Sequence, residues 1–297
     1  GYTVEWRGIK AAEYGYQQRR RRTFIFAYKN ETKYAKEMEK TVAYVPGFGE
    51  DLHRHSMSKQ ILKEGFFAKT FPVESVDAKK LKIEALPKGI GELSEHFSFL
   101  FENSGVMKDG VIYTAKTTPD YHGKQLTLGD IMDEGIVDEN YFIPQERLYY
   151  TSPDIDHSDE TKMSLSKKER QTWQYIKGAK KLKRTAASGH EYIFSEGPIA
   201  MVDAYDKPAR TMLTSEGNFS RTTHIVKDKQ TGRIRLLTAE ETERIQGFPT
   251  GHTQLCQVGE NVVEMPLNKR RFMMGNALVV DLIKQMEPEL DRIITSE

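Results

Sequence analysis

Residues 235–249 read R-L-L-T-A-E-E-T-E-R-I-Q-G-F-P, and this stretch decides how the rest of the chain is interpreted. Thr238 stands three residues before Glu241, which is the spacing of a capping box, so a helix is predicted to begin at Ala239. Gly247 is a residue type that commonly follows the end of a helix, and the proline two positions later supports an end there.

A second helix is predicted after the loop that follows, where residues 275–280 read G-N-A-L-V-V. The turn Gly275-Asn276 would open this helix, which would run over residues 277–287 and end at Pro288. The first backbone N–H groups of a helix have no partner within it, so this turn is a candidate edge for binding a polar ligand. The apolar face of the helix would hold Leu278, Leu282, Ile283 and Met286.

The two stretches together, R-x-L-T-x-x-E-x-x-R-I-Q-G-F-P followed by G-N-A, resemble the last two signature blocks of the DNA (cytosine-5) methyltransferase family. The resemblance implies that the first block holds a DNA-reading domain against the catalytic core. It also implies that the second block lies beside the methyl donor, S-adenosylmethionine. The cofactor-binding residues would then be Gly275, Asn276 and Ala277.

A run of four arginines lies near the N-terminus, in Y-G-Y-Q-Q-R-R-R-R at residues 14–22. A bare arginine run is more often a solvated basic turn than a cluster that grips a phosphate or a base edge. Its spacing, however, resembles the Gln-Arg-Arg block of the same family. The resemblance implies that Arg22 contacts the flipped cytosine in the active site and that Arg20 supports it, with Gln18 at the head of the block.

The composition is that of a soluble globular chain, because 38% of its 297 residues are hydrophobic, 29% are charged and the net charge is +1. Any nucleic-acid footprint must therefore come from local clustering of charge. No apolar run approaches the ~20 residues that span a membrane, and no signal peptide is found. The single cysteine, Cys256, excludes internal disulfides and fits a reducing bacterial cytoplasm, with association to the nucleoid when the protein is on DNA.

Residues 1–7 and 22–28 have the apolar patterns of strands, whereas the long segment that follows carries no catalytic pattern. Frequent turn signals in that segment, such as Asp109-Gly110, separate short apolar runs, which predicts a mixed α+β fold. Within it, residues 126–143 resemble a module of the target-recognition region of bacterial family members, with Thr127 as a helix cap.

Asp51, His53 and His55 would share one face if their segment were a strand, as metal ligands can. No fourth ligand is evident nearby in the sequence. Ordinary polar contacts are therefore the preferred interpretation, and no metal site is expected.

Residues 166–185 are predicted to form a basic helix, capped by Ser166 with Glu169. Such a basic face can simply be solvated, or it can contact the DNA backbone, where each neutralised phosphate adds salt-dependent affinity. Gly178 could break the helix and turn its second half into a basic loop. The candidate DNA contacts are Lys180, Lys181 and Arg184.

A polar segment at residues 214–224 is predicted between strands at residues 211–213 and 224–226. A plain hairpin turn is the simpler interpretation, but polar side chains held between strands can also present donors and acceptors to a major groove. The segment precedes the stretch at residues 235–249, which is where the resembled family keeps the end of its target-recognition domain. The candidate base-reading residues are Ser215, Glu216, Asn218, Ser220 and Arg221.

The chemistry of the resembled family needs three further blocks that normally precede the Gln-Arg-Arg block, and this sequence starts almost at that block. They supply a cysteine thiolate that attacks C6 of a flipped cytosine, a glutamate that protonates or holds N3, and a Gly-rich turn that binds the methyl donor. Two look-alikes, Leu255-Cys256-Gln257 and Glu260-Asn261-Val262, lie in the wrong place and too close together. Cys256 is therefore interpreted as an ordinary loop cysteine and not as the nucleophile.

We therefore expect the C-terminal part of a bacterial DNA (cytosine-5) methyltransferase from a restriction-modification system. Its fold would be an α/β catalytic-domain remnant of the S-adenosylmethionine-dependent type, with a large inserted mixed α+β target-recognition domain. Residues 1–29 would be the last strands of the catalytic domain, residues 30–232 the DNA-reading insert, and residues 233–297 the return to the catalytic domain.

Alone, the chain is expected to bind double-stranded DNA weakly and to transfer no methyl group. An N-terminal portion, covalent or separate, would supply the cysteine, the glutamate and most of the S-adenosylmethionine pocket, and would cover an exposed sheet edge. Two alternatives stay open, namely a non-enzymatic DNA-binding specificity subunit and an RNA methyltransferase of the same fold.

Overall fold

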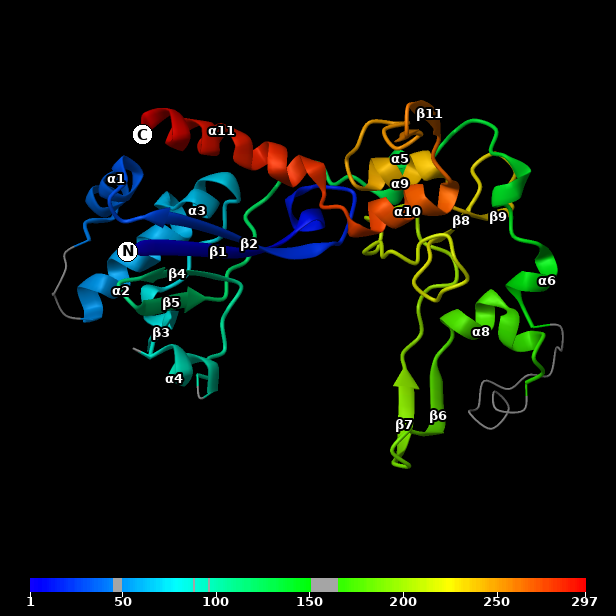
Figure 1. Cartoon of the computed structure of the whole chain (residues 1–297), viewed down its shortest axis with the longest axis horizontal. Coiled ribbons are helices and arrows are strands. Elements are labelled where there is room, and N and C mark those ends of the chain that lie inside the picture. The colour runs from blue at the N-terminus through cyan, green and yellow to red at the C-terminus, as the bar shows by residue number, and fades with distance from the viewer. Residues whose placement is uncertain (45–49, 88, 96, 151–164) are drawn as a thin grey trace. The chain divides into compact units, whose positions relative to one another are not determined.

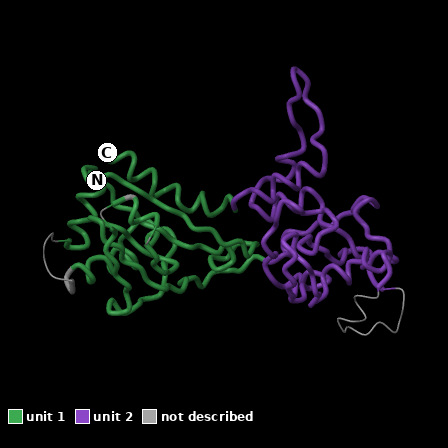
Figure 2. Tube along the Cα trace, turned by 60° about the horizontal axis from the view of Figure 1, so that its bottom comes forward, with its two compact units in different colours: residues 1–126, 279–297 green, residues 127–278 purple. Residues whose placement is uncertain are grey.

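The chain forms two compact units, of which unit 1 holds residues 1–126 and 279–297 and unit 2 holds residues 127–278 (Figure 2). Unit 2 is thus inserted in sequence between two parts of unit 1. No helix within the described ranges is both long enough and apolar enough to cross a membrane. The computed structural model describes residues 1–44, 50–87, 89–95, 97–150 and 165–297.

A five-stranded antiparallel sheet is the framework of unit 1, with the strand order β2-β1-β4-β5-β3 (Figure 1). The N-terminal pair β1 and β2 confirms the two strands predicted there. The predicted turn Asp109-Gly110 is also confirmed, because both residues have positive φ where β4 turns into β5. The strands are β1 (Tyr2–Lys10), β2 (Arg21–Lys29), β3 (Lys82–Ala85), β4 (Ser104–Lys108) and β5 (Val111–Ala115), with the 3-10 turn η1 (Ala11–Tyr14) between the first two.

Helices cover one face of this sheet and share a single apolar core with it, in which Met57, Phe66, Val106 and Leu282 are buried. These helices are α1 (Lys33–Val42), α2 (Glu50–Lys59), the π-helix η2 (Gln60–Glu64), α3 (Phe66–Thr70) and α11 (Val280–Ser296). The described part of the unit also contains η3 (Ala78–Lys80) and α4 (Ile90–Glu95).

The two faces of strand β1 have an unusual distribution of polarity. The face toward the helices carries Thr3, Glu5, Arg7 and Ile9, all buried. On this face Glu5 accepts a hydrogen bond from Gln60 Nε2 (2.8 Å), and the terminal nitrogens of Arg7 donate to the carbonyl oxygens of Ile61 (2.6 Å) and Phe71 (2.9 Å). The opposite face carries Tyr2, Val4 and Trp6.

Residues 30–126 fold with the N-terminal strands, because β3, β4 and β5 extend the sheet that β1 and β2 begin. The units divide after residues 126 and 278, whereas the sequence analysis divided the chain after residues 29 and 232. A hairpin without a third strand is only marginally stable, which explains why β1 and β2 recruit β4. All strand pairs described in unit 1 are antiparallel, so the described residues show no parallel pair of an α/β sheet.

Helix α11 runs from Val280 to Ser296 and passes through Pro288, so the predicted end at this proline is wrong. A proline inside a helix removes one backbone hydrogen bond. Tertiary contacts on both sides of the proline outweigh that loss, because the core of unit 1 buries Leu282, Met286 and Ile293. The predicted apolar face is only partly correct, since two of its four residues are exposed, Leu278 and Ile283.

Glu297, the residue that follows α11, contacts helix α1. The carboxylate of Glu297 accepts hydrogen bonds from the backbone N–H groups of Lys33 (3.1 Å) and Tyr34 (2.9 Å), at the first turn of α1. An acidic group at that position satisfies otherwise unpaired N–H groups and interacts favourably with the helix dipole. Helix α11 is therefore attached to unit 1 through both apolar and polar contacts.

The described residues of unit 2 form three hairpins and short helices around a second apolar core that contains Met212, Val226, Ile245 and Met274. The hairpins pair β6 (Lys180–Thr185) with β7 (Glu191–Glu196), β8 (Ile225–Lys227) with β9 (Ile234–Leu236), and β10 (Leu255–Val258) with β11 (Asn261–Glu264). The helices are α5 (Leu128–Ile131), α6 (Gln145–Leu148), α8 (Trp173–Lys177), α9 (Ala239–Ile245) and α10 (Leu267–Asn276), with the 3-10 turns η4 (Glu139–Tyr141) and η5 (Glu169–Gln171).

Two predicted helix starts in unit 2 are confirmed. The N–H of Glu241 donates to Thr238 Oγ1 (3.0 Å), and the N–H of Thr238 donates to Glu241 Oε2 (2.9 Å), which completes the predicted capping box of α9. Thr127 caps α5 in the same reciprocal way with Asp130. Both starts follow from local hydrogen bonding that the sequence spacing specifies.

The predicted basic helix over residues 166–185 is confirmed only in part, because two short helical segments replace its first half and a strand replaces its second half. The predicted break at Gly178 is confirmed. Ser166 and Glu169 do exchange capping hydrogen bonds (2.9 and 3.3 Å), but only η5 and α8 follow them. Gly178 ends the helical part with extended backbone, and the remaining residues form strand β6 against β7. The strand predicted at residues 211–213 is also wrong, because this segment has no strand pairing and buries Met212 in the core instead.

Candidate nucleic-acid interface

The stretch at residues 235–249 is organised by one buried arginine. The guanidinium of Arg235 donates two parallel hydrogen bonds to Glu241 (both 2.8 Å) and a third to Asp228 (3.0 Å). Glu241 also accepts a hydrogen bond from the N–H of Asp133 (2.9 Å). Because the partners of this buried ion pair are hydrogen-bonded on several sides, the pair fixes strand β9 against helix α9.

A second buried carboxylate, Glu243, joins α9 to α10. It accepts hydrogen bonds from the N–H groups of Gly251 (2.6 Å) and Thr253 (2.8 Å) and forms an ion pair with Arg270 (2.9 Å). Burial alone would raise the pKa of Glu243, but hydrogen bonds from Thr253 and Arg270 hold it below its ordinary value. The side chain of Gln246 donates to the carbonyl oxygen of the α10 residue that precedes Gly275 (2.5 Å), so the two stretches pack on each other.

Gly275 and Asn276 are the last two residues of α10 and do not open a helix. The N–H of Ala277 donates to the carbonyl oxygen of Met273 (3.0 Å), so the predicted row of unpaired N–H groups at this turn is wrong. A glycine is required at residue 275 for a different reason, because a Cβ atom there would clash with the backbone of Leu213 and its neighbour. Asn276 is exposed to solvent.

The predicted Gln-Arg-Arg block lies in unit 1, at the entrance to β2. Gln18 and Arg20 are buried, and burial together with the neighbouring Arg22 lowers the pKa of Arg20. Arg22 is exposed and donates to the carbonyl oxygen of Arg21 (3.0 Å). The three residues at 275–277 belong to unit 2, so the union of the two predicted sets into one site stays a prediction.

The loop at residues 214–224 is supported by charged side chains that the sequence analysis missed. Arg210 donates to the carbonyl oxygens of Thr222 (3.0 Å) and Thr223 (3.1 Å) and is held in place by Asp203 (2.6 Å). Lys177 donates to the carbonyl oxygen of Thr223 (2.7 Å), and burial lowers the pKa of this lysine to about 8. The loop is therefore held in a defined shape by cations that bind its carbonyl groups.

Glu216 is a structural residue of this loop. It is 3% exposed, it accepts the N–H of His224 (3.0 Å), and its other oxygen lies 2.8 Å from Nδ1 of the same histidine. The hydroxyls of Ser215 and Ser220 are half-buried and each lies 3.1 Å from a threonine hydroxyl of the loop. Asn218 is the one of the five candidate base-reading residues that is exposed.

The fifth candidate, Arg221, connects the loop to the β6–β7 hairpin. Its guanidinium forms an ion pair with Glu196 (2.8 Å), and the other oxygen of Glu196 lies 3.4 Å from Lys180 Nζ. Glu196 therefore holds two of the predicted DNA-binding cations at the base of the hairpin. No signal in the sequence indicates this role, because both ion pairs depend on the register of β6 and β7 and on the position of the 214–224 loop.

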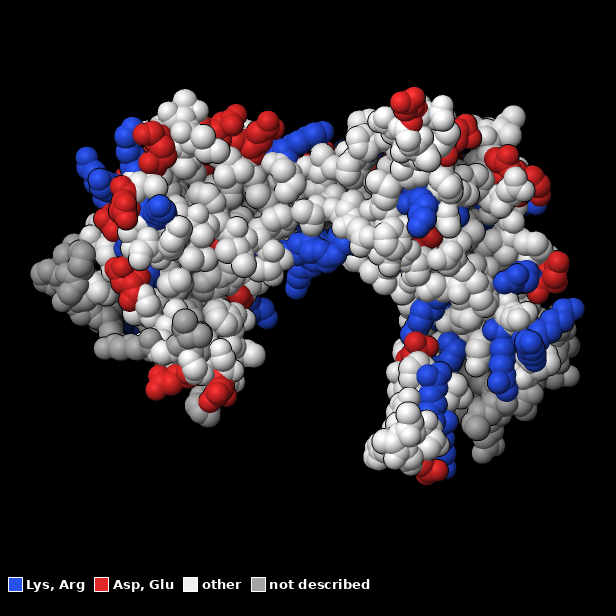
Figure 3. All heavy atoms as spheres, in the orientation of Figure 1, with Lys and Arg blue, Asp and Glu red and all other residues white. Residues whose placement is uncertain are grey.

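Exposed cations line the rest of the hairpin, which we call the ribbon (residues 180–196) (Figure 3). Of the predicted contacts, Lys181 and Arg184 are exposed there, and the guanidinium of Arg184 lies 3.7 Å from the centre of the Phe194 ring. Lys183 was not among the predicted contacts. The two-residue period of a strand would have paired it with Lys181, had residues 180–185 been assigned as a strand.

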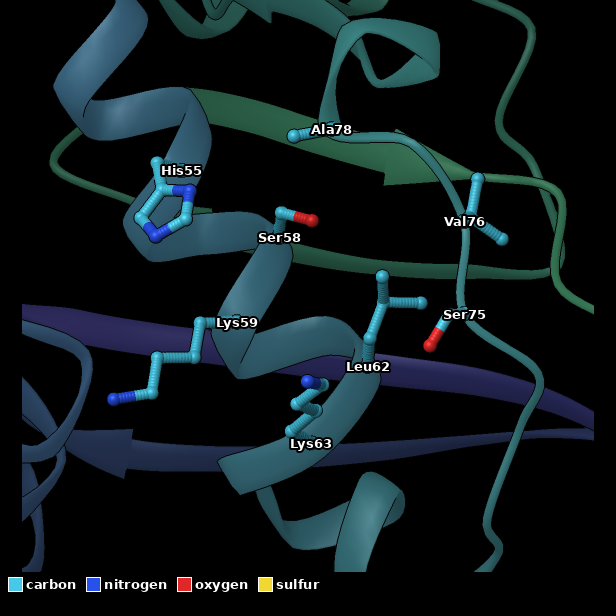
Figure 4. A pocket seen from close by; sticks show the side chains of 8 residues that line it. All are labelled: His55, Ser58, Lys59, Leu62, Lys63, Ser75, Val76 and Ala78. Atoms are coloured by element: carbon cyan, nitrogen blue, oxygen red, sulfur yellow. The ribbon is translucent and has the colours of Figure 1, made fainter.

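A pocket of about 470 Å³ lies in unit 1, where His55, Ser58 and Leu62 face Ser75, Val76 and Ala78 (Figure 4). Lys59 and Lys63 also line it, but the ammonium of Lys59 donates to the carbonyl oxygen of Thr41 (2.6 Å). The pocket contains none of the predicted site residues.

The segment that contains Asp51, His53 and His55 belongs to helix α2 and not to a strand. Residues two apart on a helix point in different directions, so the face assumed in the metal interpretation does not exist. Within the described ranges, no group of three or more His, Cys, Asp or Glu is arranged to hold a metal ion. Cys256 lies half-buried on β10, opposite Val263 of β11, so it is a strand residue and not a loop residue.

Comparison with known proteins gives three findings. The sequence model of the family described as C-5 cytosine-specific DNA methylase matches residues 1–292. The Type II methyltransferase M.Sau3AI of Staphylococcus aureus is 38% identical over 294 residues, which cover 99% of this chain and 60% of that relative. The solved structure of the Entamoeba histolytica methyltransferase EhMeth covers 71% of this chain and 55% of its own, at 12% identity and a TM-score of 0.30, a likeness too weak to carry an argument.

Proposed function

The chain belongs to the C-5 cytosine-specific DNA methylase family, and from this premise we propose that it forms part of an enzyme that methylates C5 of cytosine in double-stranded DNA. S-adenosylmethionine would supply the methyl group. The observation that carries the proposal is the packing of the two signature stretches on each other in unit 2, through Glu243 with Arg270 and through Gln246. The name of the M.Sau3AI relative supports a role in restriction and modification.

We assign the cytosine-facing role to Arg22, whose exposed guanidinium stays charged and can donate to a base carbonyl oxygen. Arg20 would support it from its buried position. Gln18 supports the proposal in another way, because both polar atoms of its side chain are buried and have no hydrogen-bond partner within the described residues. Buried amides normally find partners, so Gln18 is expected to acquire them when the site is completed.

The cofactor edge would rest mainly on Asn276. The backbone of Leu213 fills the space beside the Cα atom of Gly275, so a cofactor cannot bind there. The N–H of Ala277 already donates a hydrogen bond within the protein. Asn276 presents an exposed amide, which can both donate and accept a hydrogen bond, so it is the residue of the three that fits a polar cofactor. Gly275 and Ala277 would shape the turn that carries this amide.

The nucleophile and most of the cofactor pocket are proposed to come from outside these 297 residues. The chain spans about 60% of the length of the relative that it matches, and its single cysteine lies on a hairpin of unit 2. Unit 1 offers a place for such a portion to pack, because β2 is an edge strand in the described sheet. A pocket of about 530 Å³ lies on the adjoining face of β1 and β2, and its lining includes Trp6 and the 70% exposed Ile25.

Unit 2 is proposed to read DNA. The candidates whose side chains are exposed, Lys181, Arg184 and Asn218, would contact the duplex directly. The remaining candidates would act by holding the loop and the ribbon in shape, and these are Lys180, Ser215, Glu216, Ser220 and Arg221.

The test is transfer of a labelled methyl group from S-adenosylmethionine to duplex DNA. The chain is assayed alone and together with a separately expressed catalytic segment of a family member that carries the Pro-Cys-Gln and Glu-Asn-Val blocks. We expect transfer only in the mixture, and we expect it to be lost in Arg22→Ala. Transfer by the chain alone that disappears in Cys256→Ser would overturn the assignment of the nucleophile.

If the chain binds duplex DNA but no mixture transfers a methyl group, we would infer that the chain is a non-enzymatic specificity subunit. Titration of the mixture with S-adenosylmethionine separates the two functions, because only the enzyme predicts weaker binding in Asn276→Ala. Competition between duplex DNA and transfer RNA tests the choice of nucleic acid.

A further inference from the structure

The ribbon has two different faces. Each of its strands has six residues, about 20 Å of extended chain, and side chains alternate between the faces along each strand. The pairing of Lys181 with Ser195, of Lys183 with Ile193 and of Thr185 with Glu191 places these six residues on one face. The other face carries Leu182, Arg184, Tyr192 and Phe194, with the Lys180–Glu196 ion pair at its base.

The second face is packed on itself. The guanidinium of Arg184 lies over the ring of Phe194, and Leu182 and Phe194, which are directly opposite each other, are half-buried. Such cross-strand contacts stabilise an isolated hairpin, which would otherwise be marginal. The packing of Leu182 and Phe194 therefore has a structural explanation, and the exposed Arg184 on this face would contact a phosphate and not a base edge.

The first face has no comparable internal packing. Lys181, Lys183, Thr185 and Ser195 are exposed on it, and Ile193 is 56% exposed. Ile193 is a large apolar residue among lysines and hydroxyl residues on a solvent-facing strand. Its exposed side chain contributes little apolar burial to the fold. This face carries two lysines, two hydroxyl residues and one branched apolar group, with the single carboxylate of Glu191 at the end next to the turn. Lysines bind phosphates and guanine, hydroxyls bind any base edge, and apolar groups contact the methyl group of thymine, so the face matches the backbone and major groove of duplex DNA.

On these grounds we propose that the ribbon enters the major groove of duplex DNA with the face that carries Lys181, Lys183, Thr185, Ile193 and Ser195, and that Ile193 reads a thymine methyl group. The inference rests on the proposed function of unit 2. The major groove of B-DNA is about 12 Å wide and admits a two-stranded ribbon. Glu196, which holds both Lys180 and Arg221, fixes the ribbon relative to the 214–224 loop, so that both contact one stretch of DNA.

The experiment uses the full chain and a duplex selected by that chain from a random library. Affinity is measured by fluorescence anisotropy over a range of salt concentrations for wild type, Lys183→Gln and, as a matched loss of one exposed charge, Lys269→Gln on α10. We expect Lys183→Gln to weaken binding roughly three- to tenfold and to lower the salt slope by about one, because one phosphate contact is lost. Lys269→Gln should behave as wild type.

The second arm replaces each thymine of the selected site by uracil, which lacks the methyl group. Wild type should lose roughly three- to fivefold in affinity at one position, the value expected for one buried methyl group. Ile193→Ala should abolish that loss while thermal unfolding stays unchanged, since the side chain is exposed.

Each outcome bears on one claim. A chain that selects no duplex at all contradicts the proposed function of unit 2. A chain that binds DNA but shows the same affinity and salt slope in Lys183→Gln and Lys269→Gln overturns the placement of the ribbon. A uracil loss that is absent in wild type, or that persists in Ile193→Ala, overturns the assignment of Ile193 as a reader of thymine.

Discussion

Replacement of Glu5 by glutamine should stabilise unit 1 above neutral pH. The Glu5 carboxylate is buried beneath the helices of the sheet and accepts a hydrogen bond from Gln60 Nε2 (2.8 Å). Burial raises the pKa of Glu5 from 4.5 to about 7, and this is only partly opposed by the hydrogen bond from Gln60, the charge of Arg7 and hydrogen bonds from the backbone of Phe66 and Phe67. Glutamine keeps the shape of the side chain and an acceptor oxygen while it removes the ionisation.

The sign of the effect follows from the two pKa values. Because the pKa of Glu5 is higher in the folded protein, the folded protein holds the proton more tightly than the unfolded chain does. The stability that the protonated carboxyl contributes is complete below about pH 4.5 and is lost as the pH rises through about 7. The full loss is on the order of 3 kcal/mol, since one pKa unit corresponds to about 1.4 kcal/mol.

The assay is urea unfolding of wild type and Glu5→Gln at about pH 5 and about pH 8, within the range in which this carboxyl titrates. Trp6 reports on unit 1 when the other tryptophan is removed by Trp173→Phe. The free energy of unfolding of wild type should fall relative to Glu5→Gln between the two pH values by about 2–3 kcal/mol. The exposed control Glu31→Gln should not separate from wild type in this way. If Glu5→Gln shows the same pH dependence as wild type, the burial argument is refuted.

Three further substitutions test unit 2, each by chemical or thermal unfolding. Arg235→Met leaves Glu241 buried without its cation and should lower the free energy of unfolding by about 3–5 kcal/mol; a change below 1 kcal/mol would show that the ion pair does not hold β9 on α9. Thr238→Ala removes one half of a capping box and should lower the free energy of unfolding by about 1 kcal/mol, and an unchanged value would contradict the cap. Gly275→Ala forces a Cβ atom into the neighbouring backbone and should lower the melting temperature, whereas Gly91→Ala, which has open space around it, should not; equal effects would contradict the close contact.

Local signals in the sequence predicted local structure well. The pairs Thr238 with Glu241 and Thr127 with Asp130 form the capping hydrogen bonds that their spacing specifies, and Asp109-Gly110 forms the predicted turn. Each of these features is decided by residues within four positions of one another, so a short window of sequence contains the whole cause.

Features decided by distant partners could not be predicted. The segment at residues 180–185 has good helix formers, and it becomes a strand because β7 pairs with it and Gly178 ends the helix before it. Pro288 does not end α11, because the core of unit 1 binds the helix on both sides of the proline. Strand β1 pairs with β4, and Val4 lies opposite Met107 in this pairing, so no local pattern of the sequence predicts it.

The candidate site shows the same division. Sequence spacing identified Arg235 and Glu241 as parts of one stretch, but not the ion pair between them, which needs the geometry of β9 against α9. Composition identified a basic segment around Lys181, but the face on which each cation lies depends on the strand register. Arg210 was not predicted, because its partners are carbonyl oxygens of a loop. Every residue has a main-chain carbonyl group, so the residue types do not indicate such a contact.

The position of α11 in the chain has a consequence for how the protein is made. The ribosome releases this helix after the whole of unit 2 has emerged, yet Leu282 and Met286 fill the core in which Tyr34 and Phe66 are buried. Until α11 is synthesised, the nascent unit 1 exposes that apolar surface, and chaperones are expected to bind it. Unit 2, which is contiguous in sequence, can fold first, so removal of α11 would leave unit 2 folded and unit 1 a target for proteolysis.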